Sequence, residues 1–534
     1  MSGRIGTIAA QVSAEVKTRL RSPATLFALA FVFAGSVLWI PDPKGNASSL
    51  SWRLADGREQ APVYDSAYIG FAAAMLACIA VTLVGFYLVA GSVRRDRERG
   101  VGAILAATPL SKTEYLAGKA AAHAVYLLVV LGLALCAAVT AWVRFGVGKF
   151  SAFDFLVPFL LLSVPGVALT ASLALLFDCT PPLSGRGGLV AWFFVFGLVL
   201  AALPMMLAGT NGRGRLARMP LLDPAGAATG AWLAQQSVPG GVSFSTGLEI
   251  RDTPFARVPW KGVPVTPALV AVRASNVLLA LLPLGLAVAV FDRFDPARRR
   301  RAPRPARTSR LAERFRRGPG EAPSAALGTG AASATRTPVA ARPSAWTSVL
   351  AEALLIWKGA SFLKWPLLAS AVVAGFVPLR AGASAFFLLL VPAVSEVGAR
   401  EELAGTRALV FSQPGVPASP ALWKTAAVCL FLLILGAPLA IRATRSSPVR
   451  GLAVLAGILF VAGAAAGLAS LTSGGKLFSG AYLVLWYLAV NNLPAADFAG
   501  AFRREPAPLT SMLYLLGGAA LAAAAAFRDR LRAR

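Results

Sequence analysis

The chain has 534 residues, of which 57% are hydrophobic and only 14% are charged. Ordinary soluble domains are about 45–50% apolar and about 25% charged, so this composition excludes soluble globular, fibrous, disulfide-stapled and disordered proteins. A membrane-spanning helix takes about 20 apolar residues, so roughly half of this chain fits about a dozen of them. We therefore expect an all-α polytopic membrane protein.

The charge is strongly basic: lysine and arginine total 52, aspartate and glutamate 24, and the net charge is +28. In a soluble protein such an excess indicates nucleic-acid binding. Here the basic residues lie mainly between apolar runs, as the positive-inside rule requires of cytoplasmic loops, so we expect no nucleic-acid partner. The four cysteines form no C-x-x-C pair and the chain has one histidine, so we expect neither a disulfide framework nor a metal site.

The chain starts with an amphipathic segment, residues 5–22, whose apolar positions recur at helical spacing beside basic residues. We predict a helix lying on the membrane surface and no cleavable signal peptide. Six candidate spans follow on each side of a long polar stretch. They cover residues 24–40, 67–92, 120–142, 154–177, 188–208 and 268–291, then 365–379, 383–399, 423–441, 450–472, 476–493 and 509–527. The pair on either side of Arg380 also reads as one broken hairpin.

The loops give the orientation. Four segments rich in lysine and arginine fall on one side: the N-terminal segment, loop 93–119, the stretch 292–346 and the C-terminal tail. With these inside, both termini are cytoplasmic. Loops 41–66 and 209–266 then face outside, and the second could form a small extracytoplasmic cap. A group of three arginines disagrees with the rule, because it falls on the outer side: Arg442, Arg445 and Arg450.

The polar stretch divides the chain into a first transmembrane half, 1–292, a linker, 293–345, and a second transmembrane half, 346–534. The linker begins with an arginine-rich run and becomes rich in Gly, Ala, Pro, Ser and Thr. This composition buries too little apolar surface to fold. Its basic part is expected near the anionic inner leaflet.

An internal repeat follows the second span of each half. Gly100 precedes Pro109 by nine residues and Lys119 by nineteen, and Gly405 precedes Pro414 and Lys424 by the same numbers. The glycine permits a turn, a short apolar stretch follows, and the proline ends any helix there. A short helix with an apolar face outside the lipid needs a protein partner. Two copies indicate a partner with two equivalent grooves.

The string RRDRERGVGAILAATPLSKTEYLAGK, which contains the first copy, resembles the cytoplasmic loop between the second and third helices of ABC-2 type permeases. These are the membrane subunits of ATP-binding-cassette exporters. The resemblance implies about twelve transmembrane helices in two pseudo-symmetric six-helix halves, each with an N-terminal elbow helix and a cytoplasmic coupling helix. The second copy, REELAGTRALVFSQPGVPASPALWK, keeps the spacing but has two extra residues between Glu401 and Gly405, relative to Glu98 and Gly100.

The resemblance also implies which residues act and with whom. The coupling residues would be Arg97, Glu98, Gly100, Ile104, Leu105 and Pro109 in the first copy and Arg400, Glu401, Glu402, Gly405, Leu409 and Pro414 in the second; the elbow helix would carry Glu15, Lys17, Arg19 and Arg21. Two separate ABC ATPase subunits would bind ATP and Mg, at the inner membrane of a bacterium. The chain has no G-x-x-x-x-G-K-[ST] loop, so we expect no nucleotide, cofactor or enzyme activity in the chain itself.

Two other classes of membrane protein remain as alternatives. A twelve-helix secondary transporter of the major-facilitator type also has two six-helix halves, but ion-coupled transport usually needs ionisable residues deep in the membrane. The predicted spans are nearly free of them. A polytopic membrane enzyme needs a clustered catalytic site, and His123 has no obvious partner. The Ala/Gly/Leu-rich spans suit either an apolar, lipid-like or peptide substrate or close helix packing, and the substrate itself stays open.

Overall fold

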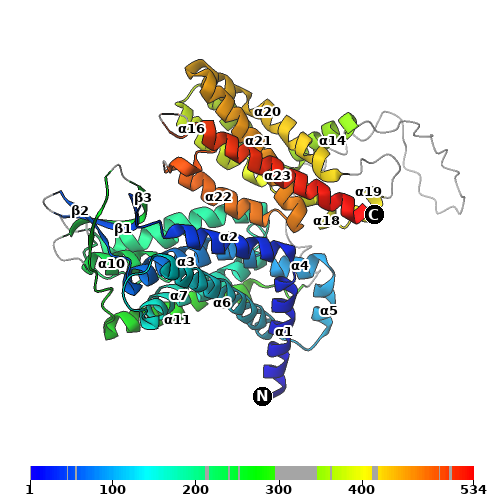
Figure 1. Cartoon of the computed structure of the whole chain (residues 1–534). Helices are drawn as coiled ribbons and strands as arrows, with labels where there is room; N and C mark the ends of the chain where they lie inside the picture. The colour runs from blue at the N-terminus through cyan, green and yellow to red at the C-terminus, as the bar shows by residue number, and fades with distance from the viewer. Residues whose placement is uncertain are drawn as a thin grey trace, which may run out of the picture.

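The computed structural model is mostly helical (Figure 1) and describes residues 2–44, 46–54, 57–210, 216–237, 241–250, 253–294, 345–360, 364–411, 419–491, 493–503, 505 and 508–533. Pro414 and nearly all of the predicted linker 293–345 lie outside these residues. The predictions made for them therefore stay predictions.

The first half consists of long helices with two short ones in the loop after the second span. In chain order these are α1 (Ser2–Leu20), α2 (Pro23–Trp39), α3 (Ser66–Val89), α4 (Ser92–Glu98), α5 (Val101–Ala107), α6 (Lys112–Phe145), α7 (Ala152–Cys179), α8 (Arg186–Phe194), η1 (Val195–Ala202), α9 (Leu203–Ala208), α10 (Ala227–Gln236) and α11 (Pro267–Val290). Helices α1 and α2 meet at a bend of 75°, as expected where a surface helix turns into a span.

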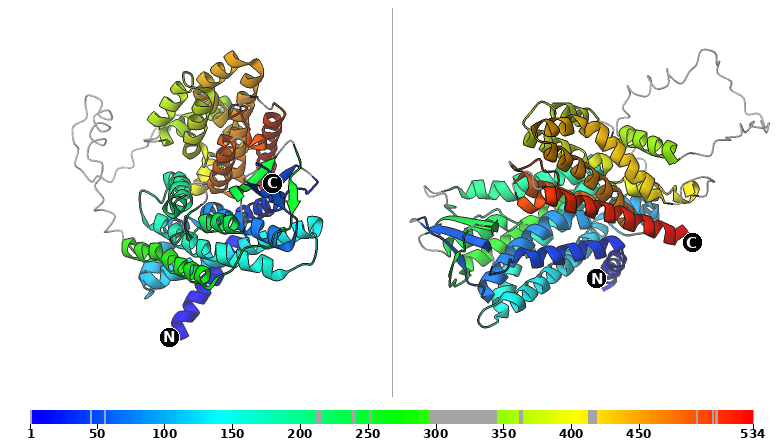
Figure 2. Two further views of the ribbon diagram at one scale, coloured as in Figure 1. Left: turned by 90° about the vertical axis from the view of Figure 1, so that its left-hand side faces the viewer. Right: turned by 45° about the horizontal axis from the view of Figure 1, so that its top comes forward.

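The second half follows the same order. Its helices are α14 (Ala345–Gly359), α15 (Lys364–Val373), α16 (Leu379–Leu389), α17 (Val391–Val394), η3 (Val397–Ala399), α18 (Arg400–Leu403), α19 (Arg407–Phe411), α20 (Pro420–Ser446), α21 (Pro448–Thr472), α22 (Lys476–Val490), η4 (Pro494–Ala496) and α23 (Pro508–Ala533). The two halves lie side by side in both views (Figures 1 and 2), and α3 and α8 of the first contact α22 of the second.

Each predicted span coincides with a helix or a run of helices, but the count of twelve full spans is not confirmed. Nine helices of the described part are long and apolar enough to cross a membrane: Ser66–Glu98, Lys112–Phe145, Ala152–Cys179, Gly187–Ala208, Pro267–Val290, Leu379–Leu403, Pro420–Ser446, Pro448–Thr472 and Pro508–Leu531. The bent pair of α1 and α2 adds a tenth if it is taken as one span. The apolar helices α15 and α22 have only 10 and 15 residues, and each is shorter than the roughly 30 Å hydrocarbon layer at about 1.5 Å per residue.

The apolar helices agree with the expected all-α membrane domain, and the two long loops 41–66 and 209–266 add a small sheet at one end of the bundle that the sequence analysis did not predict. Strands β1 (Ala47–Leu54), β2 (Glu59–Pro62), β3 (Gly241–Ile250) and β4 (Ala256–Val258) are ordered β3-β1-β2-β4. β1 pairs antiparallel with β2 and with β3, and β2 pairs parallel with β4. This pairing joins loop 41–66 to loop 209–266, so both loops lie at the same end, as the predicted topology requires. Periodicity within one loop could not reveal a partner strand from the other.

Small residues allow close helix packing in the second half. Helix α21 runs against α23, and a Cβ at Gly463 would lie 2.5 Å from the carbonyl oxygen of Gly518. A Cβ at Gly467 would similarly meet the backbone of Leu521 at 2.8 Å. Four residues separate these two glycines, so both face the same neighbour. Close packing is thus one observed use of the small residues in the spans.

Loop 209–266 enters the bundle through α10, which is largely buried and contacts α3, α7 and η1. At the start of α10, Gly226 has φ +89° and Asp223 is fully buried. The Asp223 carboxylate accepts hydrogen bonds from the backbone N–H of Gly226 at 3.0 Å and of Thr229 at 2.6 Å. The buried guanidinium of Arg273 on α11 donates to the carbonyl of Asp223 and, at 3.1 Å, to that of Leu162. A charged group therefore sits inside a predicted span, where the sequence analysis expected almost none.

The corresponding loop of the second half contains the same short motif. The motif D-x-A-G-A occurs at 223–227 and again at 497–501, between the fifth and sixth spans of each half. Asp497, like Asp223, is fully buried, and Gly500, like Gly226, has a positive φ, +59°. The Asp497 carboxylate accepts from the N–H of Ala501 at 3.2 Å. This second repeat was missed because its spacing from the first differs between the halves.

Replacement of Gly226 by alanine is predicted to destabilise the protein. The residue has a positive φ, and its new Cβ would collide with the carbonyl oxygen of Leu162. The strain and the overlap together should cost about 2–4 kcal/mol, read as a lower melting temperature in detergent. Gly148→Ala is the matched control, since Gly148 has the same φ of +89° but open space around it. Equal losses in both variants would contradict the close approach of α10 and α7.

Candidate functional site

The first coupling segment is a pair of short helices joined at a glycine. Helix α4 ends at Glu98, Gly100 has φ +76°, and α5 runs from Val101 to Ala107. The predicted turn and short helix are therefore both present. Thr108 is extended, as expected before Pro109. The base of the segment is capped by the Asp178 carboxylate of α7, which accepts from the N–H of Gly91 at 2.6 Å and of Val93 at 3.1 Å.

The predicted coupling side chains of this segment differ in exposure. Ile104 is 69% exposed, Leu105 is half-buried, and Pro109 and Glu98 are exposed. Val101 on the same helix is 40% exposed, so α5 leaves two apolar side chains uncovered while its other side is packed. Arg97 instead faces inward, because its guanidinium lies 3.0 Å from the Asp292 carboxylate just after α11.

The end of α11 folds back under this segment. Arg293 and Phe294 both have positive φ, 53° and 64°, a backbone conformation that costs free energy in residues other than glycine. The turn brings the Phe294 ring against α5, where a Cβ on Gly102 would lie 2.6 Å from it. Arg293 donates to the carbonyl of Thr108 at 2.8 Å. The first coupling segment is thus fastened to the sixth span as well as to the second.

The second coupling segment has the same design. Helix α18 ends at Leu403, Gly405 has φ +68°, and α19 begins at Arg407. Leu409 is 67% exposed, the counterpart in exposure of Ile104. Glu402 lies 3.5 Å from Arg407 in an ion pair within the segment. The predicted end of this segment, Pro414, lies outside the described residues.

The elbow helix α1 meets the first coupling segment through buried charges. Of the four predicted elbow residues, Glu15 and Arg19 are buried, and Lys17 and Arg21 are exposed. Glu15 forms ion pairs with Arg19 at 3.0 Å, with Arg95 of α4 at 2.6 Å and with Lys119 of α6 at 2.7 Å. One carboxylate therefore ties the elbow helix, the coupling segment and the third span together.

Electrostatics keeps this carboxylate ionised. Burial by itself raises the pKa of Glu15, but the positive charges of Arg19, Lys119 and Arg95 outweigh that effect and hold the pKa well below its usual range. Asp96 adds a second carboxylate, 2.8 Å from the Lys119 ammonium, and accepts a hydrogen bond from the Tyr115 hydroxyl at 2.7 Å. The cluster is therefore charged and closely compensated.

The second half contains the same kind of cluster. Its elbow helix α14 carries the buried Glu352, which pairs with Arg400 of α18. Glu401 pairs with Lys424 of α20, and the Lys424 ammonium also donates to the carbonyl of Val397 at 3.0 Å. Burial raises the pKa of Glu352, although Arg400 and Lys424 oppose this. An elbow carboxylate, a pair of charged residues in the coupling segment and a lysine on the third span occur in both halves.

These contacts correct the register of the repeat. Arg95 and Asp96 precede Gly100 by five and four residues, and Arg400 and Glu401 precede Gly405 by the same numbers. The matching of Arg97-Glu98 with Arg400-Glu401, with two extra residues in the second copy, is therefore replaced by a match without a gap. In this register each arginine meets an elbow glutamate and each acidic residue meets the lysine of the third span.

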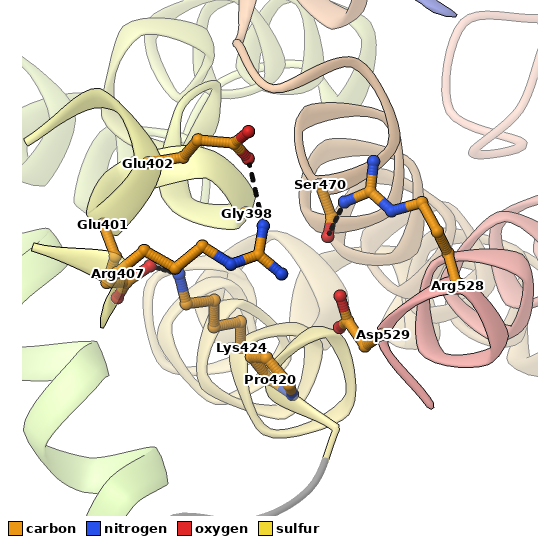
Figure 3. A pocket seen from close by; sticks show the side chains of 9 residues that line it. All are labelled: Gly398, Glu401, Glu402, Arg407, Pro420, Lys424, Ser470, Arg528 and Asp529. Atoms are coloured by element: carbon orange, nitrogen blue, oxygen red, sulfur yellow. Dashed lines mark hydrogen bonds and ion pairs between the residues drawn. The ribbon is translucent and has the colours of Figure 1, made fainter. Parts of the chain in front are cut away.

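A small pocket lies beside the second segment (Figure 3). Its walls come from η3, α18 and α19 and from the ends of α20, α21 and α23. The lining residues are Gly398, Glu401, Glu402, Arg407, Pro420, Lys424, Ser470, Arg528 and Asp529. Arg528 donates to the carbonyl of Leu471 at 2.9 Å, and Asp529 accepts from the N–H of Ala421 at 3.0 Å. The carboxylates and the basic groups of the pocket balance one another, so it does not favour ligands of one charge.

Both coupling segments lie at the same end of the helix bundle, away from the sheet. Figure 1 shows α5 and α19 at one end and β1, β2 and β3 at the other, and the second view of Figure 2 also shows both termini away from the strands. Arg94 on α4 and Glu396 just before α18 come within 3.9 Å of each other. The predicted placement of the two segments on one side of the bundle is therefore observed.

Several residues of this site were missed by sequence reasoning. Glu352 and Asp178 were not predicted to take part, and Asp96 was not predicted to lie in a buried cluster, because a single acidic residue in a basic loop or at a span end looks like an ordinary surface charge. Lys119 and Lys424 were noticed only as spacing markers. The usable signal was in the gapless register of the repeat, which places arginine and acidic residues at equivalent positions.

Replacement of Glu15 by glutamine is predicted to lower stability by about 3 kcal/mol or more, because Lys119 and Arg95 lose a buried counter-ion. Since the pKa of Glu15 is lower in the folded than in the unfolded chain, its stabilisation is present above the ordinary value of 4.5 and is lost as the pH falls. Melting temperatures of the detergent-purified protein should therefore fall less steeply with acid in Glu15→Gln than in the wild type.

Glu98→Gln is the matched control, because the Glu98 side chain is 52% exposed and pairs with Arg94 only at 3.5 Å. We expect its stability to change by about 0.5 kcal/mol or less. A Glu15→Gln protein with wild-type stability and pH dependence would contradict the role assigned to the buried cluster.

Comparison with known proteins agrees with this geometry. Residues 44–219 match the family model described as ABC-2 family transporter protein. No curated protein and no solved structure gives a significant match. The matched segment runs from β1 past α9 and includes the whole first coupling segment and its anchors on α6 and α7. Through these residues, about a third of the chain, the protein is similar to ABC-2 family transporter proteins.

Proposed function

We propose that this chain is the permease of an ATP-driven ABC-2 type exporter, with two six-helix halves fused in one chain. A separate ATPase hydrolyses ATP, and this chain converts the resulting motion into translocation of a substrate. The observation that carries the proposal is the pair of coupling segments. Each has an exposed apolar residue, Ile104 or Leu409, on a short helix at the same end of the bundle.

The anchors of the segments suit the transmission of force. In the first half, Glu15 links α1, α4 and α6, and Arg97 links α4 to the residue after α11. Packed helices joined by compensated buried charges move as rigid bodies rather than deform. A push on α5 is therefore carried into the second, third and sixth spans together. The same argument applies to Arg400 and Lys424 in the second half.

The partner expected at these segments is an ABC ATPase subunit, and two copies of the segment favour two such subunits. ATP and Mg bind to that partner in this scheme, and the chain itself contributes docking surfaces. Docking of an apolar side chain into a partner groove is the helix-in-groove mode of recognition. Closure of the two ATPases would press on both segments and change the relation of the two halves.

The proposed location is the inner membrane of a bacterium, with both termini in the cytoplasm. Support comes from the basic residues of the first coupling segment and of the two terminal segments, which lie at the end of the bundle away from the sheet. The arginines Arg442 and Arg445 remain on the outer side in this orientation. Arg442 donates to the carbonyl of Gly375 at 3.5 Å, in the turn before α16.

Replacement of Ile104 or Leu409 by aspartate is predicted to weaken binding of the ATPase. Both side chains are about two-thirds exposed in the permease, so a charge there costs little stability but spoils an apolar interface. We expect each single variant to lower ATPase recovery about tenfold in a copurification from detergent, as loss of one interface anchor does. The double variant should abolish it.

Val265→Asp is the control, since Val265 is 42% exposed at the outer end, just before α11. It should leave copurification unchanged. If no ATPase accompanies the wild-type chain, the proposal fails. If transport stops with a proton-gradient uncoupler in vesicles supplied with ATP, a secondary transporter replaces it.

A further inference from the structure

A lysine of the second half contacts the first half at the start of the first coupling segment. Lys476, the first residue of α22, reaches across the boundary between the halves, and its ammonium donates to the carbonyl of Ala90 at the end of α3. The next residue, Gly91, begins α4 and has φ +82°. A Cβ on Gly91 would collide with the Lys476 ammonium, so only glycine leaves room for this contact.

A carboxylate of the first half binds the backbone at the same turn between α3 and α4. Asp178 caps α4 through the N–H groups of Gly91 and Val93. The Lys476 ammonium binds the carbonyl of Ala90, and the Asp178 carboxylate accepts from the N–H of the next residue, Gly91. A cation of one half and a carboxylate of the other therefore both bind the chain where α3 turns into α4.

A second contact lies one helical turn further along the coupling segment. The Arg94 guanidinium on α4 lies 3.9 Å from the Glu396 carboxylate of the second half. Glu396 is held close to the start of α22, because a Cβ on Gly475 would lie 2.9 Å from its side chain. Arg94 also donates to the carbonyl of Ser184, just before α8, at 3.2 Å. Lys476 and Glu396 thus meet the first segment as a pair.

We propose that Lys476 and Glu396 form a cross-half clamp that fixes the position of the first coupling segment relative to the second half. The clamp is a pair of positioning residues: it sets the spacing of the two docking helices before any ATPase binds. It also passes a push on the first segment directly to α22 of the other half. This inference concerns the two halves of the permease and holds whether or not the docking partner is the proposed ATPase.

Gly91, which joins the second span (α3) to the coupling segment (α4), is suited to act as a hinge. Gly91 is the only position between α3 and α4 in the left-handed region, so the segment joins the second span through a flexible residue. Glu15, Asp178 and Asp292 tie α4 to the helices of the first half. The two cross-half contacts add a fixed position relative to the second half, so a movement of the segment against that half requires both contacts to break.

The test measures the distance between the two coupling segments in the purified full chain without any ATPase. Spin labels are placed at Ile104→Cys and Leu409→Cys, both exposed, in a background whose four native cysteines are replaced by serine or alanine. With the clamp intact, we expect one narrow distance distribution. Lys476→Met and the separate variant Glu396→Gln should each enlarge a displaced population about five- to thirtyfold, the change in an equilibrium when one such contact is lost.

Lys358→Met is the matched control, an exposed lysine on α14 in the same half, and should leave the distribution unchanged. Lys476→Arg retains a donor for the Ala90 carbonyl and should restore at least part of the narrow population, which a merely destabilised fold would not show. An unchanged distribution in Glu396→Gln and Lys476→Met overturns the clamp. If Lys476→Met fails to fold, Glu396→Gln and Arg94→Gln decide, since both side chains are partly exposed. Copurification of an ATPase with these variants is scored separately, so loss of the clamp and loss of the proposed function are distinguishable.

Discussion

The structure depends on one buried carboxylate in each half that holds a pair of short helices against the long ones. A coupling segment of two short helices has too few contacts to hold its own position, since isolated helices of this length are marginal in water. Glu15 supplies the missing constraint by meeting Arg95 and Lys119 at once, and Glu352 meets Arg400. Such buried pairs add little net stability compared with apolar packing, but they fix one geometry.

Different kinds of interaction stabilise the two ends of the bundle. At the end that carries the two coupling segments, charged side chains bind one another and the carbonyl groups at helix ends. At the opposite end, backbone hydrogen bonds join two distant loops in a sheet, and the buried Asp223 and Asp497 bind the N–H groups of the loops between the fifth and sixth spans. Between the ends, glycine and alanine let helices approach closely, as at Gly463 and Gly518. The long apolar helices therefore connect the buried ion pairs at one end to the hydrogen-bonded loops at the other.

The comparison of the halves shows a repeat with unequal surroundings. Both coupling segments turn at a glycine with positive φ and rest on an elbow glutamate and a lysine of the third span. The first is also held by Asp292 and Phe294 after the sixth span and by Lys476 and Glu396 of the other half. The two halves differ in sequence, so contacts that one of them makes are not duplicated in the other.

The sequence alone determined the membrane class, the positions of the apolar helices and the two glycine turns with their short helices, but not how many of the helices are full spans. Each of these is a local property: apolar length, the basic loops, and the fixed spacing of Gly100, Pro109 and Lys119. Only the tertiary structure decided that Glu15 and Asp178 are anchors, that strands 47–54 and 241–250 pair, and that Arg273 serves the outer loop from within a span. The reason is that an isolated charge or a short alternating stretch has no preferred role until its partner is known. These partners lie up to about two hundred residues away, at distances that only the folded chain brings together.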